Sequence, residues 1–369
     1  MTDAPVFPMA KHYPDIPLSE YKPKPLLEIP AHVPHRARFP VVDAHNHLMD
    51  DPSPESMLEV MDRTGIKTFI NLTGNTRLSF PESGYSFRVR DIGFFVDGYV
   101  RKHPGRFACF TMSDFANIED PVLIKCGGFA GRAADRLEDD VKRGASGLKI
   151  TKELGLKFMD DGGSFVPVDD RRLDPVWEKA GMLEVPVLIH TSDPVGFFLP
   201  INGDNEHYPT LRKTPGWSFF GSRYSKMELL AQRNRMIERH PKTVFICAHV
   251  GNYPENLSYV AGFLDAHPNA FVDISARIDE LGRQPYTARD FMVRYRDRIL
   301  FGTDMPVRAD VYRAYFRFLE TADEYFEHPD YFGNFGNSRW RIYGLGLPDD
   351  VLIKVYGENA RRIIPGLRA

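Results

Sequence analysis

Eight short apolar runs, rich in β-branched residues, alternate with stretches that have helical spacing, and this alternation constrains the fold more than any other feature. The apolar runs are residues 41–45, 66–72, 107–112, 145–150, 185–190, 243–249, 270–274 and 298–303. The helical stretches include residues 54–64, 94–102, 173–183, 226–238 and 256–266. A strand–helix–strand repeat predicts parallel strands that are joined by right-handed crossovers.

Eight such strands are the number that closes a (β/α)8 barrel. An open, doubly wound α/β sheet is the main alternative, but that fold usually carries a glycine-rich phosphate loop after its first strand. The first predicted strand instead runs into the sequence His45-Asn46-His47-Leu48-Met49. We therefore expect an α/β protein with a single TIM barrel over residues 41–369 and long loops after strands 5 and 8.

Residues 1–40 are rich in proline and show no apolar period, so they cannot build a core of their own. We expect them to form an extended N-terminal arm and not a domain. An arm that reached a neighbouring subunit would make the protein a homo-oligomer, which is a hypothesis that the sequence leaves open.

The composition excludes some classes of protein. A net charge of −3 gives no basic footprint for nucleic acid and no polybasic segment for a membrane surface. No apolar run approaches the roughly 20 residues that span a bilayer, and residues 1–20 do not read as a signal peptide. The three cysteines, Cys109, Cys126 and Cys247, share no C-x-x-C spacing and predict reduced thiols in a cytoplasmic protein.

Two histidines lie two residues apart where the first apolar run ends. Side chains at positions i and i+2 of a strand point to the same face, so His45 and His47 can aim at one point, with Asp43 on the same side one pleat deeper. Imidazole nitrogen is a common ligand for zinc. A chain with 12 histidines often contains such a pair by chance, so the motif needs support from the rest of the sequence.

Other predicted strands end in polar side chains as well. Chemistry in a TIM barrel takes place at the carboxyl ends of the strands. Strand 4 ends in Lys149, strand 5 in His190, strand 6 in His249 and strand 8 in Asp304. A histidine in such a place can also be a satisfied core residue, and an aspartate can be a helix N-cap, but their combination with the two histidines of strand 1 favours a metal site.

Three neutral imidazoles and one carboxylate suit Zn²⁺, with Mn²⁺ or Fe²⁺ as alternatives. A catalytic metal keeps a position open for water, whose pKa falls from 15.7 towards ~7 on zinc. Asp304 is placed to act as the base while it contacts the metal. His249 can polarise the substrate oxygen or hold the water.

The sequence resembles the amidohydrolase superfamily, in particular the amidohydrolase-related (amidohydrolase 2) branch of metal-dependent TIM-barrel hydrolases. The resemblance covers about residues 41–365. It rests on D-x-H-x-H at residues 43–47, on the histidines and the aspartate that end strands 5, 6 and 8, and on the flanking residues 174–177, 248–251, 301–304 and 355–360. It implies one metal held by His45, His47, His190 and Asp304, with His249 close by as a catalytic residue. In binuclear relatives the histidine of strand 6 binds a second metal.

Lys149 has two alternative roles under this resemblance. Some members carry a carboxylated lysine that bridges two metals, and others have an ordinary lysine that holds a substrate carboxylate or stays protonated beside the site. A lysine that pairs with a nearby acid such as Glu153 is the plain structural alternative. One ion is favoured over two, and both remain open.

The predicted loops suggest the kind of substrate. Residues 192–224 after strand 5 are rich in aromatic residues, among them Trp217, and can form an apolar lid. Arg277 follows strand 7 and Arg308 follows strand 8, where arginine suits a carboxylate. We expect these three residues to bind a small aromatic or cyclic molecule that bears a carboxylate.

Two functions compete. The first is hydrolysis of a C–O or C–N bond, in a lactone, ester or amide, by a metal-activated water. The second is metal-dependent, non-oxidative decarboxylation of an aromatic or unsaturated acid, which the same branch also performs; decarboxylating relatives often have glutamate where Asp43 stands, so this residue leans slightly towards hydrolysis. A non-catalytic metal-binding barrel is a third alternative.

Overall fold

The computed structural model describes residues 15–17, 20–21, 23–80, 85–118, 120, 122–124, 127–329 and 338–367. The chain divides into two units, Met1–Ala31 and His32–Ala369. The described residues of the first unit contain no helix or strand. Residues 32–40 belong with the second unit, although they were expected in the arm, because main-chain bonds such as Ala37 N–H to the Thr64 carbonyl tie them down.

Eight parallel strands correspond to the eight apolar runs, so this expectation is confirmed. They are β1 (Val41–Asn46), β2 (Ile66–Asn71), β5 (Phe107–Cys109), β7 (Leu148–Ile150), β9 (Val187–Ile189), β10 (Phe245–Cys247), β11 (Ala270–Asp273) and β12 (Ile299–Leu300). They pair in two groups, β1-β2-β5 and β7-β9-β10-β11-β12.

Main-chain hydrogen bonds join these two groups at both edges. The Lys149 N–H at β7 donates to the Thr111 carbonyl just after β5 at 2.7 Å. The Ala44 N–H of β1 donates to the Phe301 carbonyl just after β12 at 3.0 Å. The order of strands therefore returns to β1 after β12, and the sheet closes into a barrel.

Side chains of the strands alternate between two apolar clusters. The inner cluster includes Val42, Ala44, Ile70, Ala108, Leu188, Ile246, Phe271 and Leu300. Their neighbours along each strand, such as Phe69, Val187 and Cys247, belong to a larger cluster beneath the helices. This period of two is what a barrel requires, because one face lines the interior and the other supports the helices.

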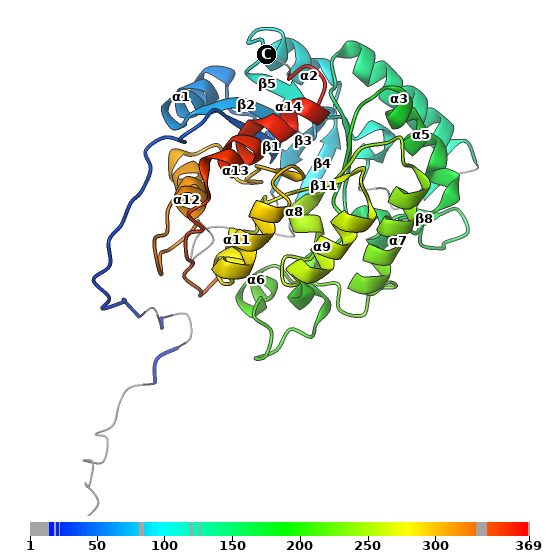
Figure 1. Cartoon of the computed structure of the whole chain (residues 1–369). Helices are drawn as coiled ribbons and strands as arrows, with labels where there is room; N and C mark the ends of the chain where they lie inside the picture. Colours follow the sequence, from blue (N-terminus) through cyan, green and yellow to red (C-terminus); the bar gives the residue numbers. More distant parts are fainter. Residues whose placement is uncertain are drawn as a thin grey trace, which may run out of the picture. The chain divides into compact units, whose positions relative to one another are not determined.

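Helices surround the strands (Figure 1). The main ones are α1 (Pro54–Thr64), α2 (Gly93–Phe95) with a π-helical turn at Val96–Val100, α3 (Phe129–Arg143), α5 (Asp174–Met182), α7 (Lys226–Arg239), α9 (Leu257–Ala266), α11 (Pro285–Arg294), α12 (Ala309–Glu320), α13 (Asp349–Ile353) and α14 (Asn359–Ile363). Local sequence sets several ends: Ser53 caps α1 with Pro54 in its first turn, and Ser225 and Glu228 form a capping box at α7. All five stretches predicted as helical are confirmed.

Shorter elements decorate the barrel. They are the antiparallel pair β3 (Thr76–Ser79) and β4 (Ser86–Val89), the parallel pair β6 (Val122–Ile124) and β8 (Met159–Asp160), and the short helices α4 (Glu153–Leu156), α6 (Tyr208–Lys213), α8 (Ala248–Gly251) and α10 (Ile278–Gly282). The connection from β9 to α7 covers residues 190–225 and contains α6, which confirms the long loop after strand 5.

The expected long loop after strand 8 needs a correction. Only residues 301–308 separate β12 from α12, and the described residues that follow that helix, 321–329 and 338–348, contain no further helix. The apolar side chains of α12, including Tyr312, Phe316 and Leu319, are buried on one face, so a helix is more stable there than a loop.

Two expectations from the composition can be compared with the structure. Within the described residues, no helix is long and apolar enough to cross a membrane. Cys109 and Cys247 are buried free thiols, and Cys126 lies outside the described residues.

Candidate active site

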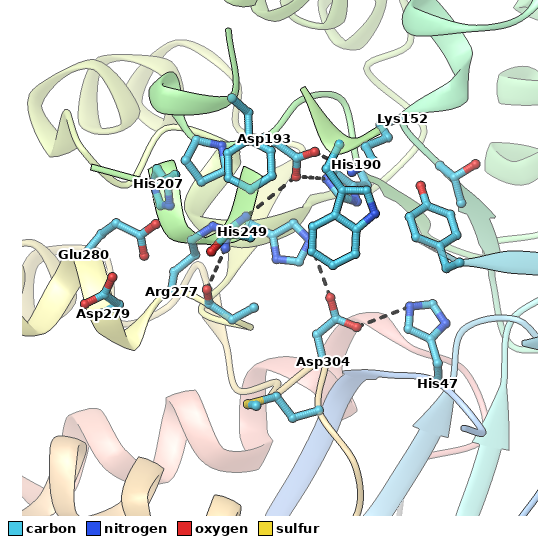
Figure 2. A pocket seen from close by; sticks show the side chains of 18 of the residues that line it. His47, Lys152, His190, Asp193, His207, His249, Arg277, Asp279, Glu280 and Asp304 are labelled. Atoms are coloured by element: carbon cyan, nitrogen blue, oxygen red, sulfur yellow. Dashed lines mark hydrogen bonds and ion pairs between the residues drawn. The ribbon is translucent and has the colours of Figure 1, made fainter. Parts of the chain in front are cut away.

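The polar side chains at the strand ends meet at the bottom of a cavity of about 260 Å³ (Figure 2). Its walls include His47, Lys149, His190, His249 and Asp304, five of the six residues predicted at the strand ends. His45, the sixth, is fully buried behind them. The structure therefore brings all six strand-end residues to one end of the barrel.

Three of them form a group that could hold a metal ion. Ligand atoms of His45, His249 and Asp304 lie within 4.8 Å of one another. The Asp304 carboxylate is 3.9 Å from His45 Nε2 and 3.8 Å from His249 Nε2, and its other oxygen is 3.5 Å from His47 Nε2. Asp304 thus lies among three imidazoles, as Figure 2 shows for His47 and His249.

The Nδ1 atom of each of these imidazoles contacts a polar group of the protein. His45 Nδ1 is 2.8 Å from the Asp273 carboxylate, and His249 Nδ1 is 2.8 Å from the Ser275 carbonyl oxygen. His47 Nδ1 is 3.1 Å from the Thr73 hydroxyl. Carboxylate and carbonyl oxygens only accept hydrogen bonds here, so His45 and His249 carry the proton on Nδ1 and have a lone pair on Nε2.

The donor set fits a divalent cation. Burial, with the positive charge of Lys149 next in importance, lowers the pKa of His45 and His47 well below the usual value, so both rings are neutral. Burial likewise lowers the pKa of His249. Burial raises the pKa of Asp304 to about 7, although the charges of Lys149 and Arg277 act to lower it. Neutral imidazole nitrogens around a carboxylate are the ligands that zinc and similar ions take.

His190 lines the same end of the cavity, but its Nε2 atom faces Asp193. Its Nε2 atom is 3.3 Å from Asp193, and its ring centroid is 4.5 Å from that of His249. It is not one of the three residues that form the tight group, and His249 takes that place. The expected ligand set was His45, His47, His190 and Asp304. In the structure, His249 and not His190 lies in the tight group with His45 and Asp304.

Lys149 points into the barrel, because its neighbours Leu148 and Ile150 belong to the outer cluster. Its Nζ atom is 3.4 Å from His45 Nε2, and burial lowers the pKa of Lys149 to about 8. The suggested ion pair with Glu153 is not formed: the Glu153 carboxylate accepts a hydrogen bond from the Tyr85 hydroxyl at 2.8 Å. Lys149 therefore belongs to the metal end of the cavity.

Two of the three predicted substrate-binding residues line the cavity. Arg277 and Trp217 are part of its wall. Arg308 is not: its guanidinium pairs with Asp310 at 2.6 Å on the surface, and 54% of its side chain is exposed. Arg308 is the residue before α12, and this position turns its side chain towards the carboxylate of the first helical turn instead of the barrel mouth. The expectation for Arg308 is thus not supported.

Asp43 does not face the metal end either. Its carboxylate accepts hydrogen bonds from Asn46, from Thr303 and from the Tyr312 hydroxyl of α12. A register shift between Asp43 and Asn46 breaks the alternation of side chains along β1. This explains why Asp43 does not face the same point as His45 and His47, although the i, i+2 spacing predicted it. Asp43 ties β1 to the end of β12 and to the helix layer.

The backbone is unusual at the same strand ends. His249 and Asp304 have φ angles of 56° and 54°, in the left-handed region that side chains other than glycine rarely adopt. Gly302 is required for close approach, because a Cβ atom there would lie 2.7 Å from His45 Cβ. The strand ends are thus held in conformations that aim side chains into the cavity.

Comparison with known proteins identifies the family of this chain. The amidohydrolase family model matches residues 42–366. The chain belongs to the amidohydrolase family. No curated protein matches the chain. The 2,6-dihydroxybenzoate decarboxylase from Rhizobium is 17% identical, with a TM-score of 0.52 over 88% of this chain and 98% of that one.

A second solved structure has the same fold. A dihydroxybenzoic acid decarboxylase from Polaromonas sp. JS666, solved with bound manganese and the inhibitor 2-nitroresorcinol, is 17% identical. Its TM-score is 0.51, over 88% of this chain and 96% of that one. Family membership makes the protein an enzyme, which rules out the non-catalytic barrel, and together with the donor set it makes a divalent metal its cofactor.

Sequence reasoning missed several residues of this amidohydrolase's site. Asp273 and Ser275 hold the rings of His45 and His249, and Asp193 pairs with the Lys152 ammonium group. The rule that identified the other strand ends, taking the last polar side chain of each strand, would have found Asp273 on β11. Asp193 follows His190 by three residues, and no spacing rule singles it out.

Proposed function

We propose that this amidohydrolase is a metal-dependent hydrolase that cleaves a C–O or C–N bond, in a lactone, ester or amide, of a small cyclic or aromatic molecule with a carboxylate. The observation that carries the proposal is the position of Asp304. Its carboxylate lies among the Nε2 atoms of His45, His47 and His249 and faces the cavity. A carboxylate so placed can take a proton from a water molecule that sits between it and the substrate.

The residues divide the chemistry between them. A divalent cation held at this site supplies Lewis acidity and lowers the pKa of a water from 15.7 to ~7. Asp304 accepts the proton of the attacking water and returns it to the leaving oxygen or nitrogen, while the water's oxygen bonds to the carbonyl carbon. His249 accepts a hydrogen bond at Nε2, because its proton is on Nδ1. Both groups therefore act on the same water.

We propose His45, His47, His190 and Asp304 as the ligands, with His249 as a catalytic residue. His45, His47 and Asp304 already face one another. His190 must exchange its contact with Asp193 for the metal, so the test compares His190→Ala with His249→Ala. The expected result is that His190→Ala loses the metal, whereas His249→Ala keeps the metal and loses turnover. The reverse pattern would move His249 into the ligand set.

Zinc is the proposed metal, in one copy per chain. Three imidazoles and a carboxylate are typical of catalytic zinc, but manganese, which is bound in the Polaromonas decarboxylase, takes oxygen and nitrogen ligands as well. Elemental analysis of the purified protein, followed by activity measurements after exchange with Zn²⁺ or Mn²⁺, decides between the two ions.

Decarboxylation is the second candidate, because the solved structures of the same fold include two dihydroxybenzoate decarboxylases. One feature of this site suits it: the Asp304 carboxyl group faces the cavity, where it can pass a proton to a substrate carbon. Aromatic side chains in the cavity wall, including Phe87, Phe197 and Trp217, suit a ring in either reaction.

The deciding experiment offers the purified enzyme a panel of lactones, aryl esters, anilides and hydroxybenzoic acids in H₂¹⁸O. Hydrolysis places ¹⁸O in the product carboxyl group, whereas decarboxylation releases CO₂ and leaves a product without that carboxyl group. We expect ¹⁸O incorporation, at least 10³-fold slower in Asp304→Asn, in line with the loss of a general base and its metal contact. Asp310→Asn, on the surface of α12, is the matched control. Release of CO₂ without ¹⁸O in any organic product would refute hydrolysis.

A further inference from the structure

We propose that the wall of the cavity beside the metal end is a recognition site for a second, non-reacting carboxylate of the substrate, built from Arg277, Glu280, Trp217 and His207. The inference rests on the proposed function, because it takes the metal end as the place where the bond is cleaved. It adds the substrate class: a compact dicarboxylate, or a molecule whose hydrolysed group lies close to a free carboxylate.

Within the described part of the chain, the guanidinium of Arg277 has unpaired donors that face the cavity. Its side chain is largely buried and lines the cavity. Nη1 donates to the Ala276 carbonyl at 2.6 Å, and Nη2 is 3.9 Å from Asp193, beyond hydrogen-bond distance. Nε has no partner among the described residues. A buried guanidinium with unused donors is costly, and an anionic group of a ligand would satisfy it.

Glu280 is the unexpected neighbour. Only 4% of the residue is exposed, it lines the cavity, and its Oε2 atom has no partner among the described residues. Three charged groups act on it: Arg277, Asp279 and Glu255. Burial outweighs the attraction of Arg277 and raises the pKa of Glu280 to about 8, so that at neutral pH this side chain is an acid that can donate a hydrogen bond.

Two further polar atoms in the wall are buried and without a hydrogen-bond partner in the described part of the chain. They are Nε1 of Trp217 and Nε2 of His207, the latter 3.6 Å from the Glu206 carboxylate. The indole N–H can only donate. Arg277, protonated Glu280 and Trp217 each offer the cavity a donor that is unpaired among the described residues. The carboxylates of Asp193, Glu206 and Asp279 line the same cavity but already pair with the cations Lys152 and Arg283. The unpaired donors therefore suit the oxygen pair of a ligand carboxylate.

The recognition site adjoins the metal end. Asp193 lies between them: one carboxylate oxygen is 3.3 Å from His190 Nε2 and 3.9 Å from Arg277 Nη2, as Figure 2 shows. One stretch of chain after β11 serves both sites, since Ser275 holds His249 and Arg277 follows two residues later. The ligand is therefore compact, in keeping with a cavity of about 260 Å³.

Binding can be measured without turnover by using probes that have no bond to hydrolyse. Isophthalate and 3-acetylbenzoate have the same shape, but the second has a neutral methyl ketone in place of one carboxylate; glutarate and 5-oxohexanoate form a flexible pair of the same kind. Titration calorimetry of the metal-loaded enzyme at pH 7 measures each affinity. We expect each dicarboxylate to bind about 10- to 100-fold more tightly than its ketone partner, the range for a charge-assisted pair of hydrogen bonds.

Three variants locate the preference. Arg277→Gln removes it, and Trp217→Phe reduces it. Glu280→Gln, which keeps a donor and nearly the same shape, retains it at pH 7 and keeps it at pH 9, where the wild type loses it because ionised Glu280 repels the ligand. Arg294→Gln and Glu59→Gln, at exposed positions of α11 and α1, are the matched controls.

The outcomes separate this inference from the proposed function. Equal affinities within either pair of probes, or no binding of any probe, overturn the recognition site. An unchanged preference in Arg277→Gln overturns it as well. A clear preference that depends on Arg277, in an enzyme that hydrolyses nothing, supports the recognition site and refutes the hydrolase.

Discussion

The Asp273 carboxylate is the group whose loss should harm metal binding most without touching the metal. Its Oδ2 atom is 2.8 Å from His45 Nδ1. Its Oδ1 atom accepts from the Ser275 hydroxyl at 2.5 Å, the Ser275 N–H at 3.0 Å and the His249 N–H at 3.1 Å. Every one of these partners is a donor, and Asp273 is fully buried.

Asp273→Asn replaces one acceptor oxygen with an NH₂ group of almost the same size. If the amide oxygen stays with the three donors at Ser275 and His249, the NH₂ group faces His45 Nδ1. His45 then has to accept at Nδ1 and carry its proton on Nε2, which removes the lone pair that would bind the metal. The loss of an outer partner of a metal ligand costs 10- to 100-fold in affinity. Because this change also inverts the tautomer, we expect the upper end, about 100-fold or roughly 2.7 kcal/mol.

The assay is a titration of the metal-depleted protein with Zn²⁺ and then Mn²⁺ in the presence of a competing chelator, followed by calorimetry. Asp310→Asn, an exposed carboxylate paired with Arg308, is the control and should bind like the wild type. Denaturant unfolding of each metal-depleted variant checks that the fold is retained. An affinity within threefold of the wild type, in a folded Asp273→Asn protein, would refute the assignment of the His45 tautomer and of its role.

Three other perturbations test separate parts of the structure. Gly302→Ala forces a Cβ atom to 2.7 Å from His45 Cβ, so denaturant unfolding should show a loss of about 1–3 kcal/mol, and metal affinity should fall with it; unchanged stability would mean that the two strands separate easily there. Lys149→Met should leave one metal equivalent per chain by elemental analysis, whereas a fall from two to one would indicate a bridging lysine. Burial raises the folded-state pKa of Glu280 from 4.5 to about 8, so its protonated form is favoured by folding: this stabilisation is complete below pH 4.5 and is lost as the pH rises through 8. Unfolding at pH 6 and pH 9 should therefore show a few kcal/mol more loss in the wild type than in Glu280→Gln, and parallel pH profiles would contradict the shift.

The barrel could be predicted from the sequence because its strands carry a strong local pattern. Runs such as residues 185–190 and 243–249 are apolar on both faces, as strands buried between an interior and a helix layer must be. The segment after strand 8 was harder to predict, because α12 is rich in aromatic residues such as Tyr312, Tyr315 and Phe316. Aromatic residues are also common in loops around a cavity, and only their helical spacing indicates a helix.

The residues at the ends of the strands could be predicted as members of the candidate site. His45, His249 and Asp304 were found because the carboxyl ends of parallel strands converge in a barrel. The direction of a side chain at such an end was not predictable. His190 pairs with Asp193 inside the cavity, and Arg308 pairs with Asp310 on the surface, because each has a charged partner within three residues along the chain. Local pairing of this kind depends on rotamers, which the spacing of residues does not encode.

The segment after β11 connects the proposed recognition site with the proposed metal site. Asp273 and Ser275 fix the rings of His45 and His249. Ala276 has a φ angle of 52°, and it and the next residue, Arg277, line the cavity. We expect a ligand carboxylate that pairs with Arg277 to restrain this segment as well, because Ser275, which contacts the His249 ring, lies only two residues earlier. A substrate without that carboxylate should therefore lose turnover as well as affinity, because its binding leaves this segment unconstrained.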